Sequence, residues 1–285
     1  MKLMRIGNPG AERPCLLDAG GTVRDISSIV GDIGPGTIDG IVERLAGVDP
    51  SALPELASEG VRIAPPMAQP RTIFCIGLNY SDHAAESGLA VPDEPILFSK
   101  AAAAFCGPND PVPYSDRMSK LDWEIELGIV IGKRALGIGE DAALDHVLGY
   151  TIVNDVSERA WQQDRGGQWV KGKSFVNFCP TGPWIVTRDE IPDPQALDME
   201  LDVNGRRMQT GNTATMIFSV RTIVAYLSEF CALEPGDLIC TGTPPGVGMG
   251  MSPPQWLKPG DVVDLRIPGL GAQRQRVTRL EDMKG

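Results

Sequence analysis

The alternation of hydrophobic and polar residues predicts a chain rich in short strands, with few helices. Apolar runs bounded by Gly, Pro or Asp recur throughout, which is typical of strands joined by tight turns. Two Pro-Gly-Asp segments, at 235–237 and 259–261, each predict a turn that leads into a strand. We expect helices at 81–87, 140–147, 157–164 and 218–229, and strands at 1–7, 72–78, 95–100, 123–131, 149–155, 183–187, 199–204, 237–241 and 261–266.

The first part of the chain reads as a separate small unit. A strand at 1–7 and a hairpin at 15–26, turning at Gly20-Gly21, are followed by a segment at 63–72 with three prolines in six residues. We expect a small N-terminal α/β domain at 1–68 and a larger domain at 69–285. Because the sequence shows neither regular βαβ alternation nor a GxGxxG motif, we expect an α+β, β-rich fold without a doubly wound parallel sheet.

Composition narrows the classes of function. The 285 residues carry a formal net charge of −11 and no run of Lys or Arg, which argues against nucleic acid as a partner. Six scattered cysteines without a CxxC pair make a disulfide framework or a zinc ribbon improbable. The first residues lack the apolar core of a signal peptide and no apolar run has membrane-spanning length. We therefore expect a cytoplasmic protein that does not associate with a membrane.

The strongest chemical feature is the segment WEIELGIVI at 123–131. In a strand, Glu124 and Glu126 point to one face, with Cβ atoms roughly 6.5–7 Å apart. Two partly buried carboxylates repel each other unless a cation neutralises them, so the pair is a candidate metal site. The alternative is an amphipathic strand whose polar face is in water.

A third carboxylate strengthens the metal hypothesis. Asp155, in GYTIVNDVSERAWQQ, lies where a strand ends and a helix begins. With Glu124 and Glu126 it makes an all-oxygen set suited to Mg²⁺, Mn²⁺ or Ca²⁺ and not to zinc. The alternative for Asp155 is a helix N-cap. Arg159 and Gln162 are three residues apart on the predicted helix, so they share a face and can bind a carboxylate or water, unless they are simply exposed.

Three other segments can carry chemistry. His83 and Glu86 are three residues apart on the predicted helix 81–87, so the carboxylate can orient the imidazole as a general base; the alternative is a surface pair. Lys173, in WVKGKSF, can stabilise an enolate or a carboxylate. The loop TGTPPGVG at 241–248 offers the hydroxyl of Thr243, although such a loop is usually only a turn.

Six segments together resemble the fumarylacetoacetate hydrolase family. They are CIGLNYSDHAAES, LDWEIELGIVIGK, GYTIVNDVSERAWQ, KGKSF, ATMIFSV and PGDLICTGTPPGVG, in the family's order across residues 72–270. The resemblance implies a mixed β-sandwich roll, usually a homodimer, and a Mg²⁺- or Mn²⁺-dependent enzyme. By resemblance, the matching positions take three roles: metal ligands (Glu124, Glu126, Asp155), a base dyad (His83, Glu86), and contacts to substrate or enolate (Lys173, Thr243).

One departure concerns the substrate. Many members read KSFDTF where this chain has Val176 and Asn177 in place of the Asp and Thr, so contacts to the distal part of the substrate differ. Segments such as ESGLAVPDEP, DRGGQW and GNTATMIF are similar to a branch often labelled ureidoglycolate lyase. That branch also contains hydrolases of 2,4-diketo-3-deoxy-L-rhamnonate and L-fuconate.

The leading hypothesis is a C–C bond hydrolase of sugar-acid catabolism that cleaves a 2,4-diketo-3-deoxy acid to pyruvate and a hydroxy acid such as lactate. The alternatives among enzymes are a ureidoglycolate lyase, an oxaloacetate decarboxylase or an acylpyruvate hydrolase, since all these substrates share the carboxylate and adjacent oxygen. A non-catalytic 2-keto-acid-binding paralogue is the alternative of another class. It predicts a damaged ligand set, whereas Glu124, Glu126, Asp155 and His83 are all present.

Overall fold

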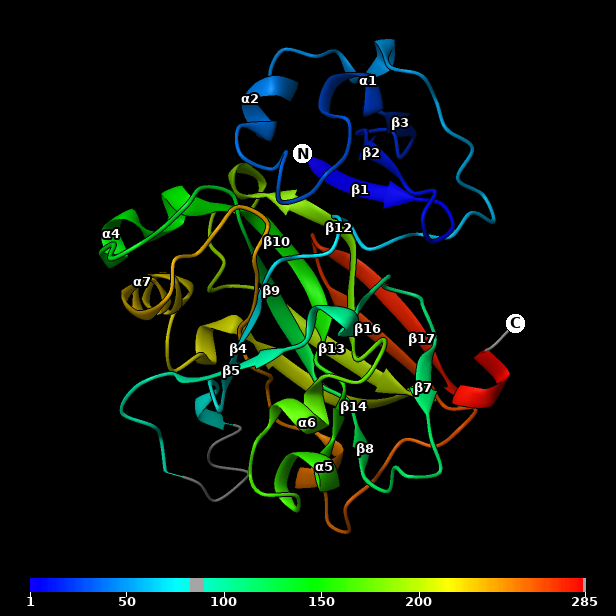
Figure 1. Ribbon diagram of the computed structural model, residues 1–285, viewed down its shortest axis with the longest axis vertical. Coiled ribbons are helices and arrows are strands. Elements are labelled where there is room, and N and C mark those ends of the chain that lie inside the picture. The colour runs from blue at the N-terminus through cyan, green and yellow to red at the C-terminus, as the bar shows by residue number, and fades with distance from the viewer. Residues whose placement is uncertain (83–89, 284–285) are drawn as a thin grey trace.

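A twisted ten-stranded sheet runs through the length of the molecule in the computed structural model, which describes residues 1–82 and 90–283 (Figure 1). Its strand order is β3-β2-β1-β12-β10-β9-β15-β4-β5, with β6 paired to β12 off this path. The strands are β1 (Lys2–Ile6), β2 (Arg13–Leu17), β3 (Val23–Asp25), β4 (Ile73–Gly77), β5 (Ile96–Lys100), β6 (Phe105–Cys106), β9 (Ile125–Ile131), β10 (Val147–Asn154), β12 (Cys179–Thr187) and β15 (Leu238–Cys240).

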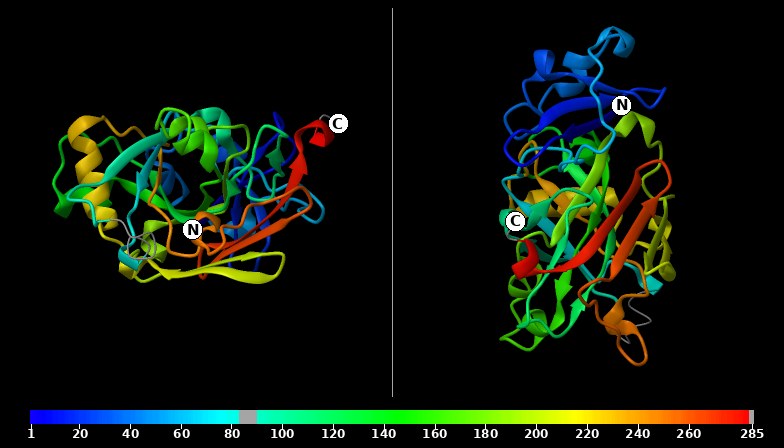
Figure 2. Two further views of the ribbon diagram at one scale, coloured as in Figure 1. Left: turned by 90° about the horizontal axis from the view of Figure 1, so that it is seen from below. Right: turned by 90° about the vertical axis from the view of Figure 1, so that its right-hand side faces the viewer.

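A second, five-stranded sheet with the order β14-β13-β16-β17-β7 packs against the first (Figure 2). Its strands are β7 (Val112–Tyr114), β13 (Asp198–Val203), β14 (Arg206–Asn212), β16 (Val262–Ile267) and β17 (Gly271–Arg279). A separate two-stranded sheet consists of β8 (Leu121–Asp122), which precedes β9 in the chain, and β11 (Ser157–Glu158), which follows β10. The result is a β-rich α+β sandwich roll, as the sequence predicts.

Buried glutamines link the two sheets. Gln273 on β17 donates to the carbonyl oxygens of Ile152 at 2.8 Å and Gly182 at 3.0 Å, and Gln209 on β14 accepts from the amide of Ile125 at 3.0 Å. Both glutamine side chains are buried, so an apolar replacement would leave backbone groups of the main sheet without partners. The Gln209 contact fixes the start of β9, which carries Glu126 and directly follows Glu124.

The helices are short and cover the sheets from outside. They are α1 (Ser27–Val30), α2 (Ile41–Leu45), α4 (Glu140–Ala143), α5 (Arg159–Gln163), α6 (Val170–Lys173) and α7 (Val220–Phe230). In α7, Ser219 accepts a hydrogen bond from the amide of Thr222 as the N-cap, and one apolar face is buried. None of the helices in the described ranges is long and apolar enough to cross a membrane.

The N-terminal strands are part of the main sheet. β1 pairs antiparallel with β12, with Lys2 opposite Val186 and Leu3 opposite Ile185. The hairpin β2–β3 forms with its turn at Gly20-Gly21, as predicted, and extends this edge of the sheet. Residues 1–68 are therefore hydrogen-bonded to the larger unit, while the boundary at 68 stays a prediction.

Most predicted elements form, but the predicted helix 81–87 lies largely outside the described residues, and the short elements β6, β7, β8 and α6 are not among the predicted ones. Three further differences have clear causes. The predicted helix 157–164 begins with the short strand β11, and only Arg159–Gln163 is helical. The predicted helix 140–147 ends as α-helix at Ala143 and continues as a 3-10 turn to His146. The strands β14 and β17 are not among the predicted ones, because polar residues such as Gln209, Gln273 and Gln275 point inward and remove the usual alternation.

Candidate metal centre and active site

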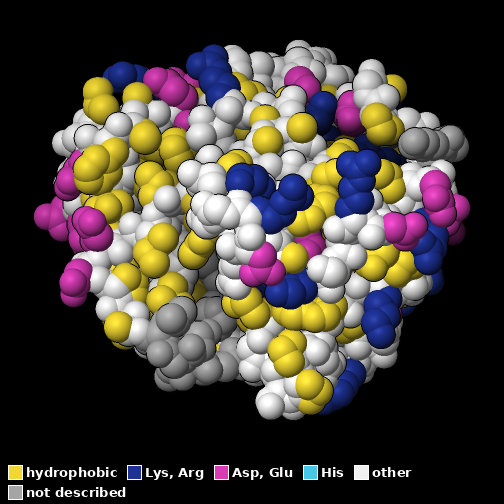
Figure 3. All heavy atoms as spheres, turned by 60° about the horizontal axis from the view of Figure 1, so that its bottom comes forward, with side chains coloured by type: hydrophobic (Ala, Val, Ile, Leu, Met, Phe, Trp, Pro, Cys, Tyr) yellow, Lys and Arg dark blue, Asp and Glu magenta, His cyan; other side chains and the backbone are white. Residues whose placement is uncertain are grey.

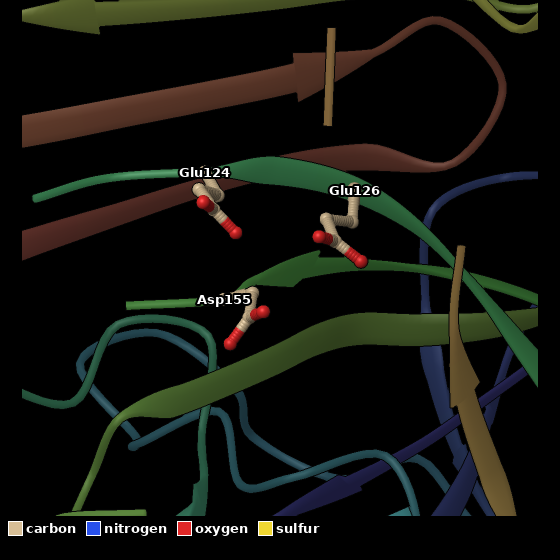
Figure 4. A group of neighbouring side chains, drawn as sticks. All are labelled: Glu124, Glu126 and Asp155. Carbon is tan, nitrogen blue, oxygen red and sulfur yellow. The ribbon is translucent and has the colours of Figure 1, made fainter. Parts of the chain in front are cut away.

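Three carboxylates meet where β9 begins and β10 ends. Glu124 precedes β9, Glu126 lies within it, and Asp155 follows β10 directly. The strands are antiparallel with Val153 opposite Glu126, and the amide of Asp155 donates to the carbonyl oxygen of Glu124 at 2.9 Å. One oxygen of each carboxylate lies within 4.8 Å of the others, and all three side chains are buried (Figure 4).

Three buried cations surround two of these carboxylates. The Lys173 Nζ bridges Glu124 Oε2 at 2.7 Å and Asp155 Oδ2 at 2.6 Å. The Arg159 Nη2 donates to Glu124 Oε1 at 2.6 Å, and Lys100 donates to Asp155 Oδ1. Glu126 instead accepts a hydrogen bond from the amide of Gly242 at 2.9 Å. The three cations are therefore paired with Glu124 and Asp155, and none of them forms an ion pair with Glu126.

This unequal distribution of charge shifts the pKa values of the two glutamates in opposite directions. Burial by itself would raise the pKa of Glu124, but the charges of Lys173 and Arg159 outweigh it and lower the pKa to about 2. Burial and the negative charges of Asp155 and Glu124 raise the pKa of Glu126 well above its ordinary value. The same carboxylates raise the pKa of Lys173 in spite of its burial, so the ammonium stays charged.

The donor set fits a hard divalent cation. Oxygens that bind one Mg²⁺ or Mn²⁺ at about 2.1 Å can lie at most about 4.2 Å apart, so atoms within 4.8 Å need only small side-chain shifts. Each carboxylate has further lone pairs beyond those that accept from Lys173, Arg159 and Lys100. A dication beside Glu126 would also remove the repulsion that raises its pKa. Glu124, Glu126 and Asp155 therefore suit such an ion.

Asp155 is not the helix cap. The residue at the N-cap of α5 is Glu158, whose carboxylate accepts a hydrogen bond from the amide of Ala160 at 3.2 Å. Both oxygens of Asp155 face lysines. Of the two interpretations that the sequence leaves open for Asp155, the geometry supports membership of the acidic cluster.

The cluster lies at a cavity of about 250 Å³. Its lining combines residues of the candidate site with apolar side chains and backbone of β4, β5 and the segments around α5 and α6. The lining residues are Ile76, Gly77, Leu78, Ile96, Phe98, Glu124, Glu126, Arg159, Gln162, Gln163, Trp169, Lys173, Gly242, Thr243 and Met249. A volume of this size holds a small organic acid.

Arg159 and Gln162 share a face of α5, as predicted, and both line the cavity. The Arg159 Nη1 donates to Gln162 Oε1 at 3.1 Å, and its Nε donates to Asp122 Oδ2 at 2.8 Å. With Glu124 as its third partner, the guanidinium binds two carboxylates of the protein. In the described structure Arg159 positions Glu124, and the predicted contact of Arg159 with substrate stays a prediction.

Thr243 follows Gly242, whose amide donates to Glu126. Its hydroxyl donates to the carbonyl oxygen of Ile125 at 2.8 Å and accepts from Gln209 Nε2 at 2.8 Å. The loop after β15 is therefore fixed to β9 on one side and to β14 on the other. Thr243 lines the cavity, and its hydroxyl proton is donated to Ile125, so its predicted contact with substrate stays a prediction.

The remaining predicted positions divide into two groups. His83 and Glu86 lie outside the described residues, so their dyad stays a prediction. Val176 and Asn177, the departures from the family motif, do not line this cavity; Val176 is 44% exposed and Asn177 donates to the carbonyl oxygen of Pro111 at 3.1 Å.

Two residues that position the cluster are missing from the sequence-based prediction. Lys100 ends β5, whose other side chains are mostly exposed, so the sequence pattern gives no sign that this lysine is buried. Asp122 accepts from Arg159, from the amide of Trp123 at 2.9 Å and from the amide of Gly248 at 2.7 Å. Only the tertiary structure brings these partners together.

The surface gives a further view of this end of the molecule. Figure 3 shows acidic, basic and hydrophobic side chains interspersed on the face that the bottom of Figure 1 presents. Acidic and basic side chains are mixed over the centre and right of that face, and a group of acidic side chains lies at its left edge.

The fold and the site are those of a strand-rich protein that gathers carboxylates and a lysine around a small cavity. Residues 72–278 match the fumarylacetoacetate (FAA) hydrolase C-terminal family, and the chain belongs to that family.

Relatives and solved structures agree with this assignment over nearly the whole chain. A protein of Burkholderia cenocepacia, whose name suggests a hydrolase and gives no substrate, is 52% identical over 277 residues, 96% of this chain and 98% of the relative. The fumarylacetoacetate hydrolase of Exiguobacterium antarcticum is 38% identical with a TM-score of 0.87, covering 98% of this chain and 99% of its own. A maleylpyruvate hydrolase of Sphingobium, solved with manganese(II) and pyruvate, is 28% identical with a TM-score of 0.80, over 98% and 99% of the chains.

Proposed function

We propose that this protein is a Mg²⁺- or Mn²⁺-dependent hydrolase that cleaves the C3–C4 bond of a 2,4-diketo-3-deoxy sugar acid, such as the L-rhamnonate derivative. One observation carries the proposal: Lys173 bridges Glu124 and Asp155 beside Glu126 at the inner wall of a small cavity. This arrangement places fixed positive charge and an all-oxygen ligand set at the same point. Both are needed where a 2-keto acid binds and a negative charge develops.

The reaction balances with water alone. Water adds to the C4 ketone, the C3–C4 bond breaks, and its electron pair forms the enolate of pyruvate. The enolate then takes up a proton at C3, and the other product is the carboxylate formed from C4. A divalent ion held by Glu124, Glu126 and Asp155 would supply positive charge to the carboxylate and 2-keto oxygens of the substrate.

Side chains of the protein supply the other roles in the reaction. The buried ammonium of Lys173 provides a second fixed charge for the enolate oxygen, and its raised pKa keeps that charge in place. Arg159 and Lys100 hold Glu124 and Asp155 in position. His83, oriented by Glu86, is the proposed base that takes the proton from water.

The relatives support the class of substrate and the metal. The Sphingobium structure binds manganese(II) and pyruvate, which is the product that the proposed reaction releases. We extend this binding mode to the present chain because its carboxylates and cavity suit the same two ligands. A homodimer in the cytoplasm, acting on a small 2-keto acid, completes the proposal.

The competing activities are ureidoglycolate lyase, oxaloacetate decarboxylase and acylpyruvate hydrolase, since their substrates share the chelating end. The test is product analysis with Mn²⁺ and a panel of these substrates. We expect pyruvate and a hydroxy acid in equal amounts from the 2,4-diketo-3-deoxy acid, with kcat/KM at least about tenfold above that for acetylpyruvate or oxaloacetate. A higher kcat/KM for ureidoglycolate would replace the hydrolase with the lyase.

A further inference from the structure

The cavity has an apolar side that leads away from the carboxylates. The Lys173 Nζ lies 5.3 Å from the centre of the Phe98 ring, and the Phe98 and Trp169 rings meet edge to face with centroids 5.1 Å apart. Ile96, two residues before Phe98 on β5, also lines the cavity and is 37% exposed. Phe98, Trp169 and Ile96, here called the apolar wall, therefore run from the reactive end to the rim.

A glycine on the neighbouring strand makes room for this wall. Gly77 on β4 pairs with Ile96 on β5. A Cβ atom at Gly77 would lie 2.5 Å from the Trp169 ring, closer than any real contact allows. The indole of Trp169 therefore packs directly on the backbone of β4, and the wall keeps its position because residue 77 has no side chain.

The described residues that line the cavity offer no free basic side chain for a second acidic group. The basic residues that line the cavity are Arg159 and Lys173, and both are held by carboxylates of the protein. A carboxylate placed against Phe98 and Trp169 would lose its hydration without gaining a partner, and transfer of an unpaired charge to apolar surroundings is costly.

We propose that the apolar wall selects the acyl end of the substrate, accepting an uncharged, methyl-terminated group and rejecting a second carboxylate. This inference rests on the proposed function, because it places the C5–C6 end of a 2,4-diketo acid against Phe98 and Trp169. It narrows the substrate class to monocarboxylic 2,4-diketo acids. A 6-deoxy sugar-acid derivative, which ends in a methyl group, belongs to that class.

The first test needs no variant. The wild-type protein with Mn²⁺ is assayed for pyruvate release from two 2,4-diketo acids of similar length, one ending in an alkyl group and one in a carboxylate. We expect kcat/KM to be at least about a hundredfold higher for the alkyl-terminated acid. Equal values would overturn the inference and leave the proposed function standing. Failure to cleave either acid would overturn the proposed function itself, and the inference with it.

The second test introduces a positive charge at the rim of the apolar wall. Ile96→Lys adds an ammonium at the rim, at a position exposed enough to accept it without unfolding the protein. Leu97→Lys is the matched control, since Leu97 is equally exposed at 37%, does not line the cavity, and points to the other face of β5. We expect Ile96→Lys to raise kcat/KM for the carboxylate-terminated acid at least about tenfold, with little change in Leu97→Lys. The same gain in both variants, or in neither, would contradict the inference.

Discussion

Replacing Lys173 by Met tests whether this lysine neutralises the acidic cluster. Its ammonium donates to Glu124 at 2.7 Å and to Asp155 at 2.6 Å, and the side chain is 2% exposed. Removing one partner of a buried ion pair costs about 3–5 kcal/mol. Since Glu124 keeps Arg159 and Asp155 keeps Lys100, we expect the lower end of that range, about 3 kcal/mol.

The assay is thermal unfolding of the metal-free protein in EDTA, repeated with Mn²⁺. At about 2–3 °C per kcal/mol for a chain of this size, Lys173→Met should lower Tm by about 6–9 °C. Mn²⁺ should raise Tm more in this variant than in the wild type, because the ion then neutralises a cluster with one more uncompensated negative charge. If Lys173 also stabilises the enolate, kcat should fall by about 10²–10³-fold.

The control is Lys171→Met on the same short helix. Lys171 is exposed, and among the described residues its ammonium donates only to the carbonyl oxygen of Arg165, so its loss should change stability by no more than about 0.5 kcal/mol. A Lys173→Met protein that melts within about 2 °C of the wild type in EDTA would refute the idea that Lys173 carries the charge balance of the site.

Three further predictions concern the candidate site. His83→Ala should lower kcat by about 10²–10⁴-fold with little change in Mn²⁺ affinity by calorimetry, and near-normal turnover would remove His83 as the base and favour a decarboxylase. Glu124→Gln should weaken Mn²⁺ binding and activity together by at least about tenfold, whereas a loss of activity alone would contradict its role as a ligand. The pKa of Glu126 is raised in the folded state, so metal-free stability should fall as pH rises above about 4.5, the unfolded value, through the folded pKa. Denaturant titrations should show this loss in the wild type and not in Glu126→Gln.

The local pattern of the chain was enough to predict the strands that carry the carboxylates. Glu124 and Glu126 alternate with apolar residues, and Asp155 directly follows a largely apolar strand, so the strand period and the strand end predicted the position of all three. The resemblance to the family, carried by the order of its motifs, predicted the β-roll. What joins the three side chains is the antiparallel pairing of β9 with β10, which the sequence alone does not specify.

The parts that escaped prediction depend on long-range contacts. The inward-facing glutamines of β14 and β17 resemble exposed polar residues until the second sheet is placed against β9 and β10. Lys100 is separated from its partner Asp155 by 55 residues, and no local pattern distinguishes it from a solvated lysine. The apolar wall likewise depends on Trp169 packing over Gly77, a contact across more than ninety positions of the chain.

The most direct test of the account is the release of pyruvate from a 2,4-diketo-3-deoxy acid by metal-stripped protein as Mn²⁺ is added. We predict no cleavage in EDTA, and cleavage that saturates at one ion per chain, with one pyruvate for each substrate consumed. Asp155→Asn should need far more Mn²⁺ to reach the same rate. Full activity in the stripped protein, or consumption of substrate without pyruvate, would contradict the assignment of Glu124, Glu126 and Asp155 as the metal site of a C–C bond hydrolase.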